Sequence, residues 1–383
     1  MLTSGINFIN FKKKLNNKKI KKHFSYLIKE NSSVINSLSK KYKDSFDKKF
    51  LKKFNKSNNL RLLGMGGSSL GSQAIYQFLK HKVKKNFEFI DNLQPSKKLN
   101  KKKYTNLIIS KSGNTIETIV NANILIKKND QNIFITENKK NYLNLLAKKL
   151  KADVIYHNNF IGGRYSVLSE VGMLPAELMG LKSKDFRQYN SLIKNKNFVN
   201  HLINNVAGTL HFLKKKKFNS VIINYDERSE NLFKWYQQLV SESLGKKKKG
   251  LLPIISNMPK DNHSVMQLYL DGFQKNFYTF FMVNERRSEK IKNKRLLTSH
   301  NFLKNKKIAE IISAQKKATE RVFKNQNIPF RSFVIKSRDE KTLGELFCFF
   351  ILETILLGRS LNLNPFDQPA VELIKEETKK ILI

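Results

Sequence analysis

The sequence has only one cysteine, Cys348, in 383 residues, and its longest uninterrupted apolar run covers residues 346–352. A lone thiol excludes an internal disulfide framework and fits a reducing compartment. The apolar run is well short of the roughly 20 residues that span a bilayer. Residues 1–30 contain lysine clusters but no continuous apolar stretch, so a secretory signal is not expected. We expect a cytoplasmic protein with no membrane partner.

Acidic residues are also scarce: the sequence has 30 Asp and Glu but 73 Lys and Arg, which gives a formal net charge of +43. Such an excess is typical of nucleic-acid-binding proteins. Only 11 of the basic residues are Arg, however, and bidentate recognition of bases and phosphates favours Arg. The lysines are spread along the chain, and no homeodomain, zinc-finger or RNA-recognition motif accompanies them. We interpret the charge as solvated surface lysine that attracts anionic substrates, with no specific nucleic-acid partner.

The chain is long enough for two domains, and 40% of its residues are hydrophobic. From about residue 60, short apolar runs alternate with amphipathic patterns, and this rhythm restarts near residue 218. Such alternation predicts parallel sheets with helices on both faces. No Pro- or Gly-rich linker marks the join. We predict an α/β fold of two doubly wound, Rossmann-like parallel-sheet domains with a helical N-terminal segment and a C-terminal helix. The predicted segments are residues 1–58, 59–195, 196–362 and 363–383.

Individual elements follow from the same patterns. We expect strands at residues 60–65, 87–91, 107–110, 133–136, 221–225, 253–256, 276–283 and 330–335. We expect helices at residues 69–79, 115–126, 142–150, 231–244, 343–357 and 369–381.

The first motif with chemical meaning is Gly64-Met65-Gly66-Gly67-Ser68-Ser69-Leu70-Gly71, which follows a predicted strand and opens a predicted helix. Glycines let the backbone approach a ligand closely, and a helix N-terminus offers N–H groups to an anion. A dinucleotide fingerprint begun at Gly64 would need glycine at position 69, which is Ser69. A phosphate or sugar-phosphate site fits better, although a tight turn would use the same glycines.

The second motif, residues 110–118, also lies between a predicted strand and a predicted helix. Hydroxyl and ammonium groups close to a helix N-terminus suit a phosphate dianion. A capping box formed by Asn114 and Glu117 would need no ligand, but it explains only part of the motif. We favour a phosphate site with these candidates: Ser110, Lys111, Ser112 and Thr115.

Two later segments contain candidate catalytic side chains. Arg164 follows two glycines within residues 161–169, so it can stabilise an oxyanion or be an ordinary loop arginine. Glu242 lies in the last turn of a predicted helix that Gly245 ends. The negative helix end disfavours the charged carboxylate, which can mark a functional base. Neutralisation of Glu242 by Lys246–Lys249 is the alternative.

The remaining candidates are ambiguous when each is taken alone. His263 lies near a predicted helix start, where a capping or surface role is commoner than catalysis. Asp367 suits an N-cap of the last helix. Gln368 and Lys375 would share a helix face with Glu372 if that helix extends far enough. A lysine beside an acid is most often a surface pair.

Taken together and in order, these segments resemble the phosphoglucose isomerase family of paired sugar-isomerase domains. The most specific are Gly-Gly-Arg-Tyr-Ser at residues 162–166 and Phe-Asp-Gln-Pro-Ala-Val-Glu at residues 366–372. The resemblance covers residues 60–383. It implies reversible aldose–ketose isomerisation of glucose 6-phosphate and fructose 6-phosphate in glycolysis and gluconeogenesis, without a metal or organic cofactor.

The resemblance also implies roles for single residues. Glu242 would shuttle a proton between sugar carbons 2 and 1, and Arg164 would stabilise the cis-enediol intermediate. His263 and Lys375 would assist ring opening, with His263 reaching the site from the other subunit of a homodimer. The phosphate and nearby substrate would be held by Gly67, Ser68, Ser110, Lys111, Ser112, Thr115 and Gln368.

Two other functions remain possible from the residues alone. The phosphate motifs would also suit a non-catalytic sugar-phosphate-binding protein, which turnover of fructose 6-phosphate would exclude. The net charge would suit a nucleic-acid binder, whose affinity would have to persist at about 200 mM salt.

Overall fold

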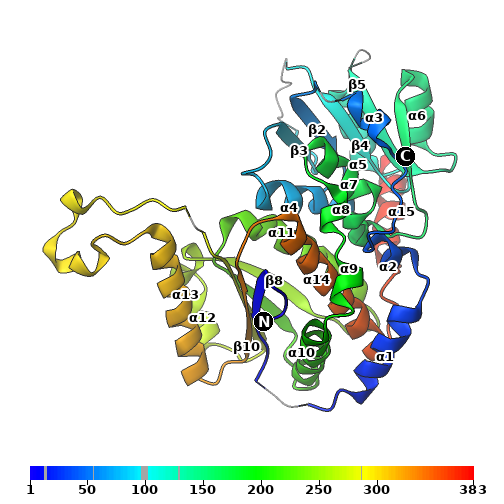
Figure 1. The fold of residues 1–383 in the computed structure, drawn as a ribbon. Coiled ribbons are helices and arrows are strands. Elements are labelled where there is room, and N and C mark those ends of the chain that lie inside the picture. The colour runs from blue at the N-terminus through cyan, green and yellow to red at the C-terminus, as the bar shows by residue number, and fades with distance from the viewer. Residues whose placement is uncertain (13–14, 55, 96–101, 128–129, 286) are drawn as a thin grey trace.

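The first parallel sheet positions the phosphate motifs. The computed structural model describes residues 1–12, 15–54, 56–95, 102–127, 130–285 and 287–383 (Figure 1). The sheet has the order β3-β2-β4-β5-β6, and all neighbouring strands are parallel. Every residue of β4 is buried, as expected for a strand covered by helices on both faces. The strands are β2 (Asn59–Leu63), β3 (Asn86–Ile90), β4 (Thr105–Ile109), β5 (Gln131–Glu137) and β6 (Asp153–His157).

The second sheet has the order β1-β10-β9-β7-β8, and its edge strand β1 is antiparallel to β10. The other pairs are parallel. Residues 6–9 are therefore a strand rather than part of the predicted N-terminal helical segment. Ile6 and Phe8 are buried whereas Asn7 and Ile9 are not, which is the alternation of a half-buried edge strand. The strands are β1 (Ile6–Ile9), β7 (Asn219–Asn224), β8 (Leu252–Asn257), β9 (Asn276–Val283) and β10 (Phe330–Ile335).

Apart from β1, the two sheets share one topology. In each, the first strand of the domain lies between the second and the third, so the chain direction across the sheet reverses beside that first strand. The reversal falls between β2 and β4 in the first sheet and between β7 and β9 in the second. Ligands of open α/β sheets bind at such a switch point, outside the carboxyl ends of the strands. The loops after β2 and β4 contain the two predicted phosphate motifs.

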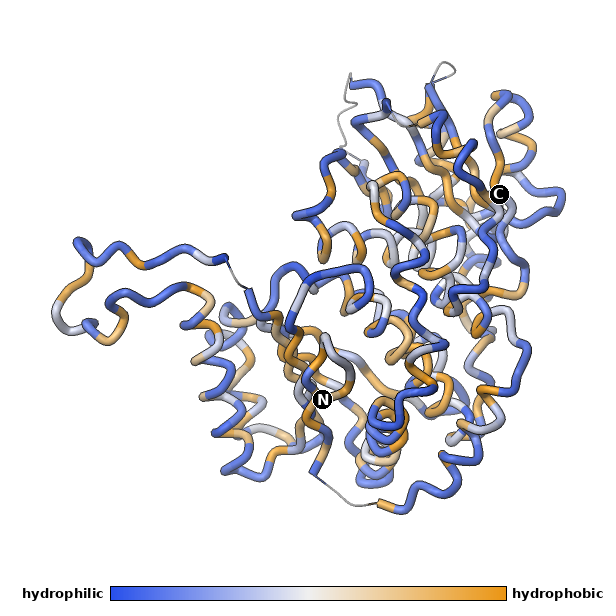
Figure 2. The backbone as a smooth tube through the Cα atoms, in the orientation of Figure 1, coloured by the Kyte–Doolittle hydropathy of each residue, from blue (hydrophilic) through white to orange (hydrophobic). Residues whose placement is uncertain are grey.

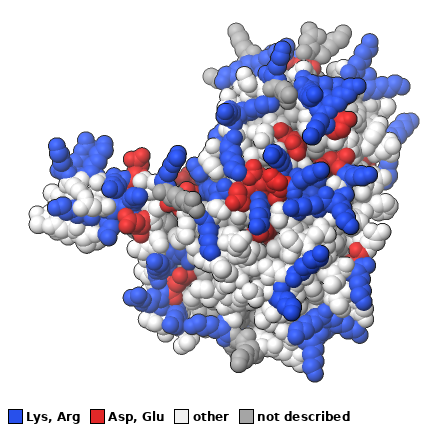
Figure 3. Space-filling view, in the orientation of Figure 1, with Lys and Arg blue, Asp and Glu red and all other residues white. Residues whose placement is uncertain are grey.

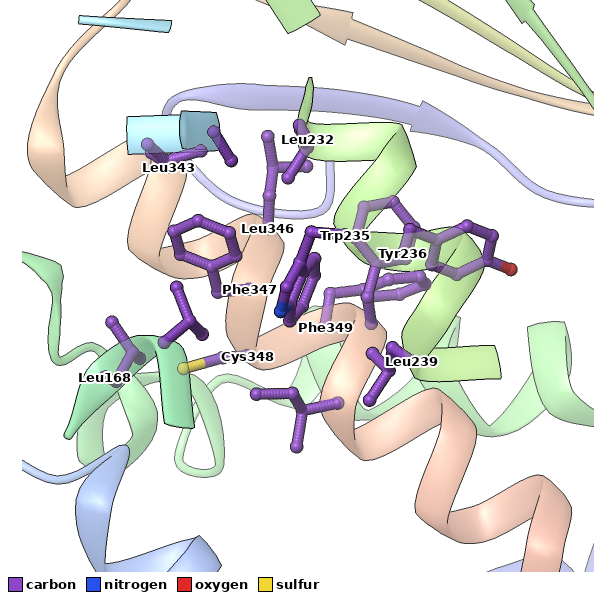
Figure 4. Close-up of a cluster of buried hydrophobic side chains, with 14 of the residues drawn as sticks. Leu168, Leu232, Trp235, Tyr236, Leu239, Leu343, Leu346, Phe347, Cys348 and Phe349 are labelled. Carbon is purple, nitrogen blue, oxygen red and sulfur yellow. The ribbon is translucent and has the colours of Figure 1, made fainter. Parts of the chain in front are cut away.

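A helix that is buried on all sides joins the domains. Residues 342–358 of α14 (Glu340–Ser360) are all buried. This helix packs against α11 (Glu230–Leu244), α10 (Lys196–Lys214), α8 (Ser183–Phe186) and α1 (Lys18–Lys29). Trp235 of α11 and Phe347 of α14 meet edge to face with their ring centroids 4.8 Å apart. Figure 4 shows the side chains of these two helices in one cluster. A helix that is apolar all round is stable only in such a core.

The helices expected from the sequence are present, with ends shifted by a few residues. The helices are α1 (Lys18–Lys29), α2 (Ser33–Ser37), α3 (Lys48–Lys52), α4 (Leu70–Phe78), α5 (Ile116–Leu125), α6 (Tyr142–Leu150), α7 (Glu170–Leu178), α8 (Ser183–Phe186), α9 (Tyr189–Leu192), α10 (Lys196–Lys214), α11 (Glu230–Leu244), α12 (Met266–Asp271), α13 (Ile308–Asn325), α14 (Glu340–Ser360) and α15 (Ala370–Leu382).

The surface combines dispersed positive charge with a few apolar projections. Hydrophobic residues concentrate in the strands and inner helices (Figure 2). Lys and Arg are spread over the face in Figure 3 and are interrupted by a group of acidic side chains. A segment before α13 projects from the body in Figure 1, and its Leu297 and Phe302 side chains are exposed. Within the described part of the chain, no helix is long and apolar enough to cross a membrane.

Candidate active site

The hydroxyl-rich loop lies at the carboxyl end of β4 and leads into α5. Ser110 is buried, and its Oγ lies 2.8 Å from Oγ1 of Thr115. The backbone N–H of Asn114 donates to Oγ of Ser112 over 3.3 Å. Nζ of Lys111 lies 3.4 Å from a carboxylate oxygen of Glu137. Ser110 and Thr115 thus meet directly before the first residue of a helix, where an anion is favoured, and Lys111 and Ser112 lie on the same loop.

The capping-box alternative for this loop is wrong. The N-cap of α5 is Thr115, and its side chain makes no capping hydrogen bond. Oδ1 of Asn114 instead accepts the backbone N–H of Tyr142, which is the first residue of α6. The polar side chains of residues 110–115 are therefore not accounted for by a cap on their own helix.

The glycine motif after β2 is explained by contact with the segment that contains Arg164. A Cβ atom on Gly67 would lie 2.1 Å from the carbonyl carbon of Gly163. Gly66 has a φ of +52°, and a Cβ there would lie 2.7 Å from Nε2 of Gln238. Gly67 leaves no room for a side chain, and the positive φ favours glycine at position 66. The turn therefore fixes the two elements beside it, and the phosphate roles of Gly67 and Ser68 stay predictions.

Arg164 is buried, and all five of its N–H groups are used. Nε donates to Oγ of Ser243 (2.8 Å), and Nη1 donates to Oε1 of Gln368 (2.6 Å) and Oε2 of Glu242 (3.1 Å). Nη2 donates to the carbonyl oxygens of Pro365 (2.8 Å) and Asp367 (2.9 Å). A buried guanidinium with every donor satisfied is held in one orientation.

Glu242 lies in the last turn of α11, as predicted. Its Oε2 contacts Arg164, and its Oε1 accepts a 2.8 Å hydrogen bond from Nε2 of Gln238 one helical turn earlier. The Glu242 side chain is 28% exposed and borders a cavity of about 510 Å³. Ser241, Asp367 and Gln368 also line this cavity. A fixed carboxylate beside a cation and an open volume can exchange protons with a bound molecule.

Lys246, the first lysine of the run after α11, does not pair with Glu242. Nζ of Lys246 lies 2.5 Å from Oδ1 of Asp367 and also donates to the Asp367 carbonyl oxygen. The hydrogen bond from Lys246 lowers the pKa of Asp367. The carboxylate of Glu242 is instead paired with Arg164.

Of the candidate side chains after Glu242 in the described part of the chain, only that of Gln368 contacts Arg164. Gln368 precedes α15 and contacts Arg164, whereas Lys375 is exposed on α15 and pairs with Glu372 over 2.7 Å. His263 is exposed at the end of a 3₁₀ helix after β8. Among the described residues, no hydrogen bond or ion pair joins His263 or Lys375 to Arg164 or Glu242. The chain thus brings together Arg164, Glu242 and Gln368 and leaves the other two apart.

Three supporting side chains were not predicted. Ser243 accepts from Arg164 and lies 2.8 Å from the hydroxyl of Tyr165, which also donates to the Pro365 carbonyl. Gln238 holds Glu242. Of these, only Gln238 had a sequence signal, because residues four apart on a helix face one another. As for metals, no group of three or more potential ligands gathers in the described residues.

A hydroxyl-rich loop at a switch point and a buried arginine–carboxylate pair beside a cavity are features that suit an α/β enzyme acting on a small phosphorylated substrate. The phosphoglucose isomerase family matches residues 35–383, and the chain belongs to that family of sugar-phosphate isomerases. It is 33% identical to the glucose-6-phosphate isomerase of Methanocaldococcus jannaschii, over 89% of this chain and 86% of that one. It is 30% identical to the corresponding Campylobacter jejuni protein, with 88% and 86% covered.

Two solved structures share the fold. A hypothetical protein from Thermus thermophilus has a TM-score of 0.82 at 22% identity, covering 96% of this chain and 94% of that one. A glucose-6-phosphate isomerase from Chlamydia trachomatis has a TM-score of 0.72 at 17% identity, with 91% and 77% covered. The predicted α/β fold of paired parallel-sheet domains is confirmed.

Proposed function

We propose that the chain interconverts glucose 6-phosphate and fructose 6-phosphate by proton transfer through a cis-enediol intermediate. The observation that carries this proposal is the 3.1 Å contact of Glu242 with Arg164 at the edge of an open cavity. Proton removal beside a carbonyl needs a base and a cation for the oxygen that becomes negative. The names of the curated relatives support the choice of sugar phosphates.

In this proposal Glu242 takes the proton from carbon 2 of the aldose and returns it to carbon 1. Arg164 stabilises the enediolate oxygen through Nη1. The partners of Nη1 are the side chains of Glu242 and Gln368, of which Gln368 can turn away, whereas Nη2 is held by main-chain carbonyl groups. A substrate oxygen can therefore replace Gln368 without moving the arginine.

The phosphate is proposed to lie at the switch point between β2 and β4. Backbone N–H groups at the start of α5 and the hydroxyl groups before it provide donors for three phosphate oxygens. Lys111 adds a positive charge. Its partner Glu137 also pairs with Lys139, so the three side chains together keep a positive charge. The residues proposed for this role are Gly67, Ser68, Ser110, Lys111, Ser112 and Thr115, with Gln368 near the sugar.

Ring opening is assigned to His263 and Lys375, with His263 supplied by a second copy in a homodimer. His263 is exposed and, among the described residues, shares no hydrogen bond or ion pair with Glu242 of its own chain, which supports a role in another subunit. Exposed apolar side chains on α15 and on the segment before α13 offer surface for such a partner. Lys375 would leave its ion pair with Glu372 to contact the sugar. This exposed pair contributes little stability, so breaking it costs little.

A coupled assay that follows glucose 6-phosphate formation from fructose 6-phosphate tests this function. We expect saturable turnover without added metal, and the same assay with mannose 6-phosphate defines the sugar specificity. Phosphate binding without turnover by the folded protein would favour a non-catalytic binding protein instead. We further propose that the enzyme acts in the cytoplasm, in glycolysis and gluconeogenesis, where the single buried thiol of Cys348 stays reduced.

A further inference from the structure

The segment that contains Arg164 is held at both ends through its main-chain carbonyl groups. Before Arg164, Nε2 of His157 lies 3.0 Å from the carbonyl oxygen of Ile161. After it, Arg187 donates to the carbonyl oxygen of Leu168 from Nε (3.2 Å) and Nη2 (3.0 Å). His157 and Arg187 are both buried. Neither was singled out by the sequence motifs, and neither touches the cavity beside Glu242.

The His157 ring faces oxygen atoms on both sides. Its Nδ1 lies 3.3 Å from Oε2 of Glu170, opposite the Ile161 contact. Each ring nitrogen thus lies within hydrogen-bonding distance of an oxygen atom, so the ring is held on both sides. Oε1 of Glu170 also accepts hydrogen bonds from the hydroxyl groups of Tyr42 (2.8 Å) and Ser45 (3.1 Å).

The charge on Glu170 is consistent with this arrangement. Burial alone would raise the pKa of Glu170, but hydrogen bonds from His157, its own backbone and Tyr42 hold it below its ordinary value. Glu170 is also the first residue of α7, where the helix dipole favours a negative charge. The Glu170 carboxylate is therefore held in place by several hydrogen-bonding groups, with the His157 ring among them.

Residues 42–45 contact both Glu170, the partner of His157, and Arg187. Arg187 is bidentate to Asp44, with Nη1 2.9 Å from Oδ2 and Nη2 2.5 Å from Oδ1. Its guanidinium also lies 5.0 Å from the centre of the Tyr42 ring. Residues 42–45 thus anchor both buried pairs, and the two pairs grip opposite ends of residues 161–168. We call these two pairs the loop clamp.

We propose that His157 and Arg187 are positioning residues that set the location of the Arg164 guanidinium for catalysis. This inference rests on the proposed function of Arg164. Replacing a buried ion pair by apolar residues often leaves the free energy of unfolding unchanged. A gain in stability therefore does not explain well why the protein has two such pairs here. Orientation is a stronger reason, because a displacement of about 1 Å can cost about a hundredfold in rate.

The test compares His157→Gln and Arg187→Gln with Arg338→Gln. Arg338 is an apt control because it forms a similarly buried bidentate pair, with Asp226, away from residues 161–168. Tyr42→Phe is a milder variant that removes one hydroxyl bond to Glu170 and keeps the ring beside Arg187. Kinetics are measured with fructose 6-phosphate at a temperature where circular dichroism shows every variant folded.

We expect kcat to fall about ten- to a hundredfold in His157→Gln and Arg187→Gln. KM and competitive inhibition by inorganic phosphate should stay within about twofold, because the loop after β4 is untouched. Tyr42→Phe should lose less, and Arg338→Gln should keep the wild-type kcat. Equal losses in all four variants, or a rise in KM with unchanged kcat, would overturn the positioning role.

A second measurement does not depend on activity. The single tryptophan of the chain, Trp235, donates from Nε1 to the carbonyl oxygen of Arg164 over 3.2 Å. Release of the clamp should change Trp235 emission and its quenching by acrylamide, and Arg338→Gln should not. Unchanged emission in both clamp variants would contradict the inference. A fluorescence change in a chain whose wild type lacks turnover would instead reject the proposed function and keep the clamp as a structural device.

Discussion

At the scale of single residues, Gly67 determines how closely the two halves of the site approach. Its backbone packs on the main chain of Gly163, directly before Arg164, so a side chain at position 67 would have to push that main chain aside. Gly162 lies in the same region, but a Cβ there would have only the Tyr165 ring at 4.0 Å. Lack of space therefore explains the glycine at position 67 but not the glycine at position 162.

We predict that Gly67→Ala destabilises the protein by about 3 kcal/mol, because the new methyl group overlaps a backbone that cannot move aside cheaply. Gly162→Ala, the matched control, should leave stability within about 0.5 kcal/mol. Urea unfolding midpoints of the two variants check this. Similar midpoints for Gly67→Ala and the wild type would show that the two turns do not touch as described.

The sequence singled out Arg164, Glu242 and Gln368 from local motifs, and they do meet. It could not predict that they contact one another, because nothing local joins residues separated by 78 or 204 positions. Asn114 shows the converse. Its spacing to Glu117 fits a local cap, but its side chain accepts the backbone N–H of Tyr142 in α6, which only the folded sheet brings near.

At the scale of elements, α14 depends on its N-cap because both domains pack on it. Oδ1 of Asp339 accepts the backbone N–H of Thr342 over 2.7 Å. Burial alone would raise the pKa of Asp339, but hydrogen bonds from Thr342 and the hydroxyl of Ser337 hold it below its usual 3.8. The positive N-terminal end of the helix also stabilises a carboxylate at this position.

We predict that Asp339→Ala costs about 1 kcal/mol at pH 7, and that Asp339→Asn, which keeps an acceptor, costs less. The folded-state pKa lies below the unfolded one, so the stabilisation by the charged form is complete above about pH 4 and is lost as the pH falls through the folded value. The difference from the wild type should therefore shrink in acid. A difference that grows in acid, measured by urea unfolding, would contradict the cap.

Elements with strong periodicity were predictable, and those defined by distant partners were not. Strands β9 and β10 and helix α6 have the predicted bounds. Strand β6 was missed because its sequence, DVIYH, lacks a sustained apolar run at the sheet edge. Strand β1 was missed because its partner β10 is at the other end of the chain. In both cases the tertiary neighbour, rather than local preference, makes the strand.

At the scale of the whole molecule, the proposed site needs a second copy. A mixture of Glu242→Gln and His263→Ala chains, unfolded and refolded together, tests this directly. Each mixed dimer would contain one site with both defects and one with neither, so activity should return to about a quarter of the wild-type value for random pairing. If the mixture is no more active than its two components, His263 does not act across an interface.

The dispersed lysines belong to this scale as well. They do not form a separate basic patch on the face in Figure 3, and the sequence alone could give their number but not their placement. The order of the strands was likewise beyond the sequence. It is this order that brings the loops after β2 and β4 to one switch point.

The central claim is that the carboxylate of Glu242 moves the proton, and Glu242→Gln tests it most directly. The amide keeps the size of the side chain but cannot accept the proton, so turnover of fructose 6-phosphate should fall at least about a hundredfold. Inhibition constants for inorganic phosphate, measured on residual activity, or its dissociation constant from calorimetry should stay within about twofold of the wild type. Turnover near the wild-type rate in this variant would contradict the account.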